Sequence, residues 1–598
     1  MNLTAFLKAV DEQTGKMDLQ ECTAFIHEIA RGYSENQRQD FLRKLKDAVS
    51  EKGCASGGGK TGRGDISLEE ETAAVLEQID LIEGGELQLN EEYNDAYDDW
   101  YNSDVEEILY KDPDGIKDIL EEAAALAHTC YDRELYGLSR ELYGRLRTID
   151  ISTDGEYSGE ALSLEEAVRM DLLDIDLDAL IRESIISTYL DSEPEERAQE
   201  IFDIFSSVHD PAVTLESFLQ SSVIELPGTQ EFLKSMVSYL GNKRGRTESR
   251  LIEEALSLED SWDDFHAAAK EYAADHPGLY KTAVFENPGN LDREQLYELS
   301  MEALEKIPER FAIRSEIALK AADLALVSGR NREAEIYRIE VFRSEVSPVN
   351  FWRAYLESEN SEHTREALRG IYSEYIDESR EILKKEYDYS PGYAYSGNET
   401  RETSPGRNAL LGILFFDGRF EEVLQYGMRT KNAVGWSSTF MKQGMALFML
   451  DLYQGKDLPY GCRAINRQAC EAVGFRAKQY CKGTERPDDG GTPDEIVFAE
   501  YFSDWKKRIP MSGELQESVL QKMEGWIRER VQGIMEGNHR RHYGECAAYI
   551  AAYGEILESR GSAGAKARIM ENYRCEYSRR RAFHEELRRF GMKDRKKK

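Results

Sequence analysis

Residues Glu309 to Ser358 read ERFAIRSEIALKAADLALVSGRNREAEIYRIEVFRSEVSPVNFWRAYLES, which is the clearest pattern in the chain. Its apolar residues recur every three or four positions, which is the period of a helix with one buried face. The pattern is interrupted around Gly329, as expected at a turn between two helices. Small residues mark the places where the two helices would cross, namely Ala321, Ala322, Ala325 and Ala334. The stretch therefore predicts a pair of packed helices.

Two more stretches repeat this arrangement. LLGILFFDGRFEEVLQY (Leu410–Tyr426) has its turn at Gly418, and the run from Tyr549 to Phe583 has its turn at Gly561. Strand signals are nearly absent, and only GELQLNEEY (Gly85–Tyr93) indicates a brief extended piece. We therefore predict an all-α protein. Because such pairs cannot bury their apolar faces alone, we expect them to stack into an α-solenoid of helical hairpins with an extended concave surface.

The stretch Leu410–Tyr426 resembles a degenerate tetratricopeptide repeat. The residues that carry this resemblance are Leu411, Gly412, Phe415, Val423 and Tyr426. The closing RRRAFHEELRRFGM (Arg579–Met592) resembles the end of uncharacterised bacterial helical-repeat proteins, some of which carry a SWIM-type zinc finger. That finger needs Cys-x-Cys and a later Cys-x-His, and the chain has neither spacing. The resemblance therefore implies architecture, and proteins of such architecture usually bind peptides or other proteins.

Composition and turn signals divide the chain into six predicted segments: a small N-terminal helical bundle (1–50), a Gly-rich flexible linker (51–66), an acidic helical region (67–290), a helical-repeat region (291–481), a loop and connector (482–510), and C-terminal helical repeats with a basic tail (511–598). The linker contains GCASGGGKTGRGD (Gly53–Asp65). A phosphate-binding loop would need glycine at Cys54 and a preceding strand, so we interpret the stretch as a hinge.

The overall charge restricts the kinds of partner. The net charge of −38 argues against nucleic acid or anionic membranes binding across the whole surface. The distribution is uneven, with 20 acidic residues against two lysines from Glu69 to Glu122, and 11 basic residues against four acidic ones from Arg574 to Lys598. No apolar run is long enough for a membrane helix, and eight scattered cysteines suit a reducing compartment. We expect a cytoplasmic protein.

An aromatic and acidic pattern marks the region from Asn90 to Asp104, which reads NEEYNDAYDDWYNSD. On a helix the rings would form one stripe with carboxylates beside it, the residues concerned being Tyr93, Tyr97, Trp100, Tyr101, Asp98 and Asp99. One interpretation is a docking surface for a protein partner with a basic, apolar segment. The other is a core stripe with a solvated acidic face.

The best metal candidate is GNHRRHYGEC. His539, His542 and Cys546 are spaced i, i+3 and i+7, so a continuous helix would bring them to one face. The alternative is structural histidines beside tyrosines, because Arg540 and Arg541 disfavour a dication. A weaker candidate is the calcium-loop-like YKDPDGIKDILE (Tyr110–Glu121), whose first position is Tyr110 rather than a carboxylate. Its other interpretation is a turn leading into a helix.

These observations favour a non-catalytic scaffold that holds a protein partner and needs no cofactor. Two alternatives remain open at this stage. One is a regulator that contacts nucleic acid through the basic tail Lys593–Lys598. The other is a metal-dependent enzyme that uses His539, His542 and Cys546.

Overall fold

The computed structural model describes residues 67–93, 108–155, 161–208, 213–221, 226–309, 311–378, 405–427, 444–476 and 494–593. The predicted N-terminal bundle (1–50) and hinge (51–66) lie outside these ranges. The chain divides into two compact units, Met1–Ala74 and Val75–Lys598.

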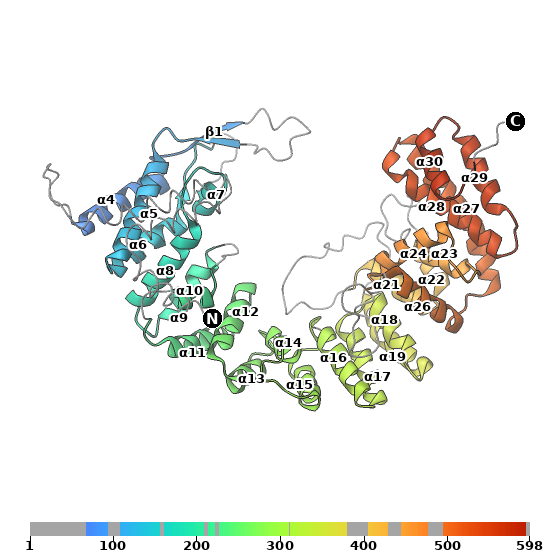
Figure 1. The fold of residues 1–598 in the computed structure, drawn as a ribbon, viewed down its shortest axis with the longest axis horizontal. Coiled ribbons are helices and arrows are strands. Elements are labelled where there is room, and N and C mark those ends of the chain that lie inside the picture. Colours follow the sequence, from blue (N-terminus) through green and yellow to red (C-terminus); the bar gives the residue numbers. More distant parts are fainter. Residues whose placement is uncertain are drawn as a thin grey trace, which may run out of the picture. The chain divides into compact units, whose positions relative to one another are not determined.

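Helices make up most of the described chain, and the all-α prediction is confirmed (Figure 1). The helices of the first half are α4 (Leu68–Glu83), α5 (Ile116–Asp132), α6 (Tyr136–Thr148), α7 (Leu164–Arg169), α8 (Leu177–Asp191), α9 (Arg197–Ser206), α10 (Leu215–Ser221), α11 (Thr229–Leu240), α12 (Arg246–Glu259), α13 (Trp262–Glu271), α14 (Gly278–Phe285) and α15 (Arg293–Lys306). None of the described helices is long and apolar enough to cross a membrane.

The second half continues in the same way. Its helices are α16 (Arg314–Val327), α17 (Asn331–Ser344), α18 (Pro348–Leu356), α19 (Ser361–Glu378), α21 (Arg407–Phe416), α22 (Phe420–Gly427), α23 (Ala446–Leu452), α24 (Tyr460–Val473), α26 (Asp494–Arg508), α27 (Gly513–Glu536), the short 3-10 helix η4 (Arg540–His542), α28 (Tyr543–Ser559), α29 (Ala565–Glu576) and α30 (Arg581–Arg589).

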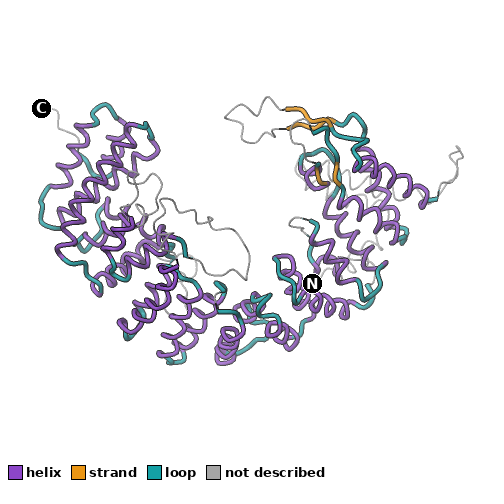
Figure 2. Tube along the Cα trace, turned by 180° about the vertical axis from the view of Figure 1, so that it is seen from behind, coloured by secondary structure: helices purple, strands orange, loops and turns teal. Residues whose placement is uncertain are grey.

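The strands form two short antiparallel pairs, seen in orange in Figure 2. Strand β1 (Asn90–Tyr93) pairs with β2 (Ile108–Lys111), and β3 (Asp150–Ile151) pairs with β4 (Leu162–Ser163). The extended piece predicted at Gly85–Tyr93 is confirmed over its last four residues, which form β1. Its partner strand β2 was not predicted, since four residues are too few for a visible alternation.

Helices pack mainly on their neighbours in the chain. Helix α16 contacts α15 and α17, α17 contacts α18 and α19, and α18 contacts α21. The helix pair predicted around Gly329 is the pair α16–α17, and all its predicted small residues are fully buried, namely Ala321, Ala322, Ala325 and Ala334. Alanine at these crossings lets the two backbones approach closely. The pairs α21–α22 and α28–α29 confirm the other two predicted helix pairs.

Two large hydrophobic clusters lie within the described residues. The first includes residues between Ile181 and Ile317, and the second includes residues between Phe342 and Met592. Further apolar side chains between Val75 and Leu180 are buried outside these two clusters. A small cluster consists of residues on α15, α16 and α17. The predicted boundary at 290/291 therefore falls inside the first core, because Leu299, Ala303 and Ile307 of the next segment belong to it.

The predicted connector 482–510 also needs correction, because α26 occupies its second half. Glycine and proline before Asp494 suggested a loop. After that point, however, Phe498, Phe502 and Trp505 recur at helical spacing and are buried in the second core. Their aromatic contacts with α21 include Phe416 against Trp505, with ring centroids 5.3 Å apart. This packing makes α26 a core helix.

Candidate functional site

The turn between α21 and α22 is the first component of the candidate site. Gly418 has a φ of 76°, which glycine adopts without strain. The N–H groups of Gly418 and Arg419 donate to the carbonyls of Phe415 and Leu414, both at 2.9 Å. This is the Schellman arrangement that ends a helix. A Cβ atom at Gly418 would lie 2.6 Å from Cγ2 of Ile509, so a larger residue would also clash.

A buried carboxylate attaches this turn to α19. Asp417 is completely buried, and side chains one turn apart on α19 converge on it. Arg365 Nε lies 2.7 Å from Oδ1, Arg369 Nε lies 2.8 Å from Oδ2, and the Tyr372 hydroxyl donates to Oδ2 at 2.6 Å. Burial and the charge of Asp417 raise the pKa of Tyr372 to about 12, so its hydroxyl stays protonated and remains a donor.

The end of α26 and the start of α27 complete the surroundings. Trp505 is fully buried and its indole N–H donates to the Phe416 carbonyl at 2.8 Å, which attaches α26 to the same turn. Ser512 caps α27, and its hydroxyl oxygen accepts the N–H of Leu515 at 3.3 Å. The amide of Gln516 donates to the Met511 carbonyl at 2.9 Å. These contacts hold the connecting residues 509–512 in place.

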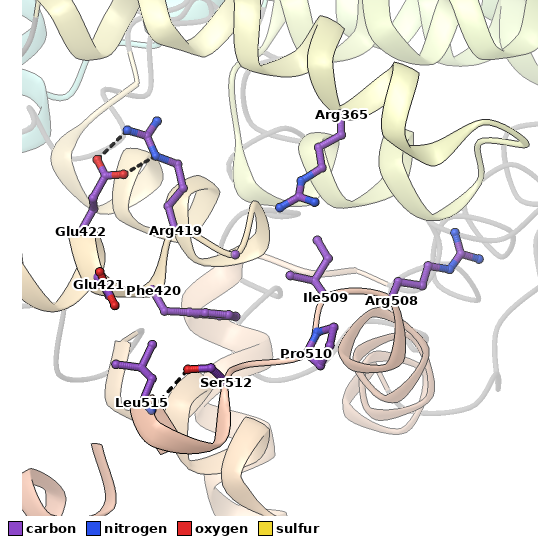
Figure 3. Close-up of a pocket in the computed structure, with 11 residues that line it drawn as sticks. Arg365, Arg419, Phe420, Glu421, Glu422, Arg508, Ile509, Pro510, Ser512 and Leu515 are labelled. Carbon is purple, nitrogen blue, oxygen red and sulfur yellow. Dashed lines mark hydrogen bonds and ion pairs between the residues drawn. The ribbon is translucent and has the colours of Figure 1, made fainter. Parts of the chain in front are cut away.

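These three segments enclose an open pocket of about 460 Å³, shown in Figure 3. Its lining comes from Arg365 of α19, from the turn and first residues of α22, and from the connection between α26 and α27. In the figure Arg365 extends from α19 toward the pocket, and Phe420 lies on the opposite side near Ser512 and Leu515. The complete lining consists of Arg365, Gly418, Arg419, Phe420, Glu421, Glu422, Arg508, Ile509, Pro510, Ser512 and Leu515.

The charged groups of the pocket differ in how they are engaged. Arg365 is bound to Asp417, and Arg419 forms a bidentate pair with Glu422, with both contacts at 2.5 Å. Arg508 and Glu421 are exposed and have no hydrogen bond or ion pair to any other residue that the structure describes. Within the described chain, the pocket therefore offers one cation and one anion that no hydrogen bond or ion pair engages, and the charge of Arg508 also acts on the buried Tyr355.

The arrangement is suited to binding. A guanidinium group, a carboxylate and the apolar surfaces of Phe420, Ile509 and Leu515 can hold a polar group and an apolar side chain at the same time. Among the described residues of the lining there is no histidine or cysteine.

No protein-family model matches this chain, and none of the curated proteins is similar enough in sequence to count as a relative.

The predicted aromatic and acidic stripe is only partly within the described chain. Tyr93 is the last residue of β1 and pairs with Ile108, so the predicted helical stripe is wrong at its first residue. The pairing of β1 with β2 satisfies backbone groups that a helix would have satisfied internally. The remaining predicted residues, Tyr97, Asp98, Asp99, Trp100 and Tyr101, lie outside the described residues.

The predicted metal candidates do not share one helical face. His539 precedes η4, His542 ends it, and Cys546 belongs to α28. Nδ1 of His542 lies 3.2 Å from Oε2 of Glu545, while Cys546 is fully buried, and burial raises the pKa of its thiol to about 12. In the ranges that the structure describes, no group of three His, Cys, Asp or Glu side chains is placed to hold a metal ion.

The calcium-loop-like segment is a helix start. Both carboxylate oxygens of Asp112 accept backbone N–H groups at 2.8 Å, from Ile116 and Lys117 of α5. Asp114 instead accepts the N–H of Gln88 at 3.1 Å, and Gly115 adopts a φ of 76°. The interpretation as a turn leading into a helix is confirmed.

A packed helix precedes the basic tail. Phe583 and Leu587 of α30 are fully buried, and Phe590 packs against the second core. Of the six residues Lys593–Lys598, the last five lie outside the described chain. The pocket residues themselves were not predicted. Their only signal is the glycine turn at Gly418, because Arg365, Arg419 and Arg508 are brought together by tertiary packing.

Proposed function

We propose that the chain is a non-catalytic scaffold that holds a protein partner, and that the pocket beside the α21–α22 turn is a point of contact. The tetratricopeptide-like helix pairs support this proposal, because stacked helical pairs of that kind commonly present binding surfaces. The proposal places the protein in the cytoplasm, as its cysteine content suggests.

The observation that carries the proposal is the contrast between the base and the rim of the pocket. At its base, the Asp417 cluster and Trp505 fix three segments that are distant in the sequence. At its rim, Arg508 and Glu421 are exposed and unengaged within the described chain. Because the base is already fixed, a partner that binds there has to order only the exposed side chains of the rim.

The test is affinity purification of the full chain from its native cells. The variant Arg508→Glu with Glu421→Arg exchanges both rim charges and keeps the net charge. The matched control is Lys507→Glu with Glu529→Lys, at exposed positions outside the pocket lining. We expect wild type and control to recover the same protein partner, and the rim variant to recover about tenfold less.

Two results would contradict this proposal. One is a partner that both double variants recover equally well. The other is the recovery of no protein above background with the wild-type chain.

A further inference from the structure

We propose that copies of this chain associate through opposite charges, with the basic surface around α30 of one copy against the acidic surface around α5 of the next. The basic surface consists of the α27–η4 connection, the α29–α30 connection and α30. The acidic surface consists of residues 84–88 and 112–122. This inference goes beyond the proposed function, because it concerns self-association and does not involve the pocket.

The basic surface is built by two connections that pack on each other. Nη2 of Arg580 donates to the Met535 carbonyl at 2.8 Å, and Nη1 of the same side chain donates to Oδ1 of Asn538. Because Arg580 attaches the start of α30 to the end of α27, basic residues of both connections come together. The exposed side chains that have no hydrogen bond or ion pair to another described residue include Arg540, Arg579 and Arg581.

The charge of this surface is positive even when every charged residue of the surrounding helices is counted. From Arg574 to Lys593 there are seven Lys and Arg against three glutamates. The whole group of helices α27 to α30, from Gly513 to Lys593, contains 15 Lys and Arg against 12 glutamates. An anionic surface is therefore attracted here, although the chain as a whole carries −38.

The acidic surface lies on α5 and beside it. The N–H of Gln88 donates to Oδ2 of Asp114 at 3.1 Å, which places the residues after α4 next to the start of α5. Residues 84–88 and 112–122 contain six Asp and Glu against one lysine, and the wider ranges 75–93 and 108–155 contain 16 against six Lys and Arg. The exposed carboxylates without a hydrogen bond or ion pair to another described residue include Glu86, Asp118 and Glu122.

A second copy fits the basic surface better than a nucleic acid does. Glu576 and Glu585 are exposed beside the arginines, and every phosphate of a nucleic acid would repel them. The acidic surface of a second copy also carries Lys117, so charges of both signs meet an opposite charge. Exposed charges more than about 8 Å apart are largely screened at physiological ionic strength, so the facing surfaces outweigh the repulsion between two acidic chains.

Sedimentation velocity of the full chain tests this association. The basic-surface variant combines Arg540→Glu, Arg579→Glu and Arg581→Glu, and the acidic-surface variant combines Glu86→Arg, Asp118→Arg and Glu122→Arg. At a salt concentration of about 0.15 M, we expect the wild type to form assemblies larger than the 68.4 kDa monomer and either variant alone to associate about tenfold more weakly. Raising the salt to about 0.5 M should dissociate the wild-type assembly.

An equimolar mixture of the two variants gives the sharpest result. The reversed arginines of one variant then face the reversed carboxylates of the other, and the unaltered surfaces also face each other. We therefore expect the mixture to associate within about threefold of wild type. The matched control combines Lys456→Glu, Lys507→Glu and Lys522→Glu, which lie at exposed positions outside both surfaces and change the net charge as much as the basic-surface variant does. This control should associate like wild type.

Several results would overturn the inference. A wild-type chain that remains a monomer at about 100 μM would reject self-association. Single variants that associate as strongly as wild type, or a mixture that stays monomeric, would show that these two surfaces do not meet. If the wild type is monomeric and a labelled RNA oligonucleotide binds to it but not to the basic-surface variant, the basic surface is a nucleic-acid site and the inference is rejected.

Discussion

Two buried carboxylates in the second core show how differently single residues are accommodated. Glu555 accepts the backbone N–H groups of Gly461 and Cys462 at 3.1 and 2.8 Å, and its Oε1 lies 2.5 Å from Nζ of Lys566. It thus occupies the N-terminus of α24 from the neighbouring α28. Asp451 is 2% exposed, and neither of its oxygens has a hydrogen-bond partner in the described structure. A buried carboxylate without donors favours its neutral form.

Asp451 therefore predicts a pH dependence of stability. Burial raises its pKa to about 6, against the opposing charges of Lys506 and Arg560. The pKa of Asp451 is therefore higher in the folded state than in the unfolded state. Its contribution to the free energy of unfolding is fully present below about pH 4 and is lost as the pH rises through about 6. We expect Asp451→Asn to raise the free energy of unfolding at pH 8 by about 1–2 kcal/mol, and to change it little at pH 4.

Urea unfolding of both proteins at pH 4 and pH 8 measures this effect. Buried charges elsewhere are common to both proteins, so the comparison isolates position 451. An Asp451→Asn protein that is less stable than wild type at pH 8 would show instead that the ionised carboxylate is stabilised by Lys506.

At the scale of elements, α17 is joined to its neighbours by buried ion pairs. Nη2 of Arg314 on α16 lies 2.6 Å from Oε1 of Glu340 on α17. Nη2 of Arg338 on α17 lies 2.6 Å from Oε2 of Glu357 at the end of α18. Both side chains of the second pair are only 7% exposed. Such pairs fix how successive helices align, because an unpaired buried charge costs far more than an exposed one.

A double-mutant cycle tests this role. We expect Arg338→Met and Glu357→Met each to lower the free energy of unfolding by about 3 kcal/mol, and the double variant to cost about as much as either alone. The matched control is the exposed pair of Arg528 and Glu524, whose Nη2 and Oε1 atoms lie 3.4 Å apart. We expect the coupling free energy of this pair to stay below about 0.5 kcal/mol. Additive losses at the buried pair would show that the two residues act independently.

The helices that sequence reasoning recovers share a visible apolar period and a glycine turn. Gly329, Gly418 and Gly561 all adopt a positive φ at the predicted turns. Helix α26 was missed because the glycine and proline before it suggested that the loop continued. The 3-10 turn at 540–542 was missed because spacing alone cannot show that a helix is interrupted.

The candidate site was beyond sequence reasoning for a different reason. Arg365, Asp417 and Arg508 are separated by tens of residues, and Arg365 and Arg508 lie outside every motif identified in the sequence. They meet because Asp417 is buried against α19 and Trp505 is buried against α21. Only the packing of these helices places them around one pocket.

At the scale of the whole molecule, the two large cores of the described chain predict more than one cooperative unfolding unit. Phe205 is fully buried in the first core and Phe448 in the second. Helical repeat arrays are stabilised mainly by contacts between neighbours, so distant parts need not unfold together. Each Phe→Ala substitution should lower the free energy of unfolding of its own unit by about 3–5 kcal/mol.

Differential scanning calorimetry distinguishes these units. We expect at least two transitions in the wild-type chain, with Phe205→Ala lowering the temperature of one and Phe448→Ala that of another. A single transition that both substitutions shift equally would show that the two cores unfold as one.

The most direct test of the proposed function is site-specific photocrosslinking in the native cells. A photoreactive amino acid replaces Glu421 at the pocket rim, and in a matched strain it replaces Glu529, which is exposed on α27 outside the pocket lining. We predict a crosslink to one protein from position 421 and none from position 529. A chain that yields no crosslink at 421, or the same products at both positions, would contradict it.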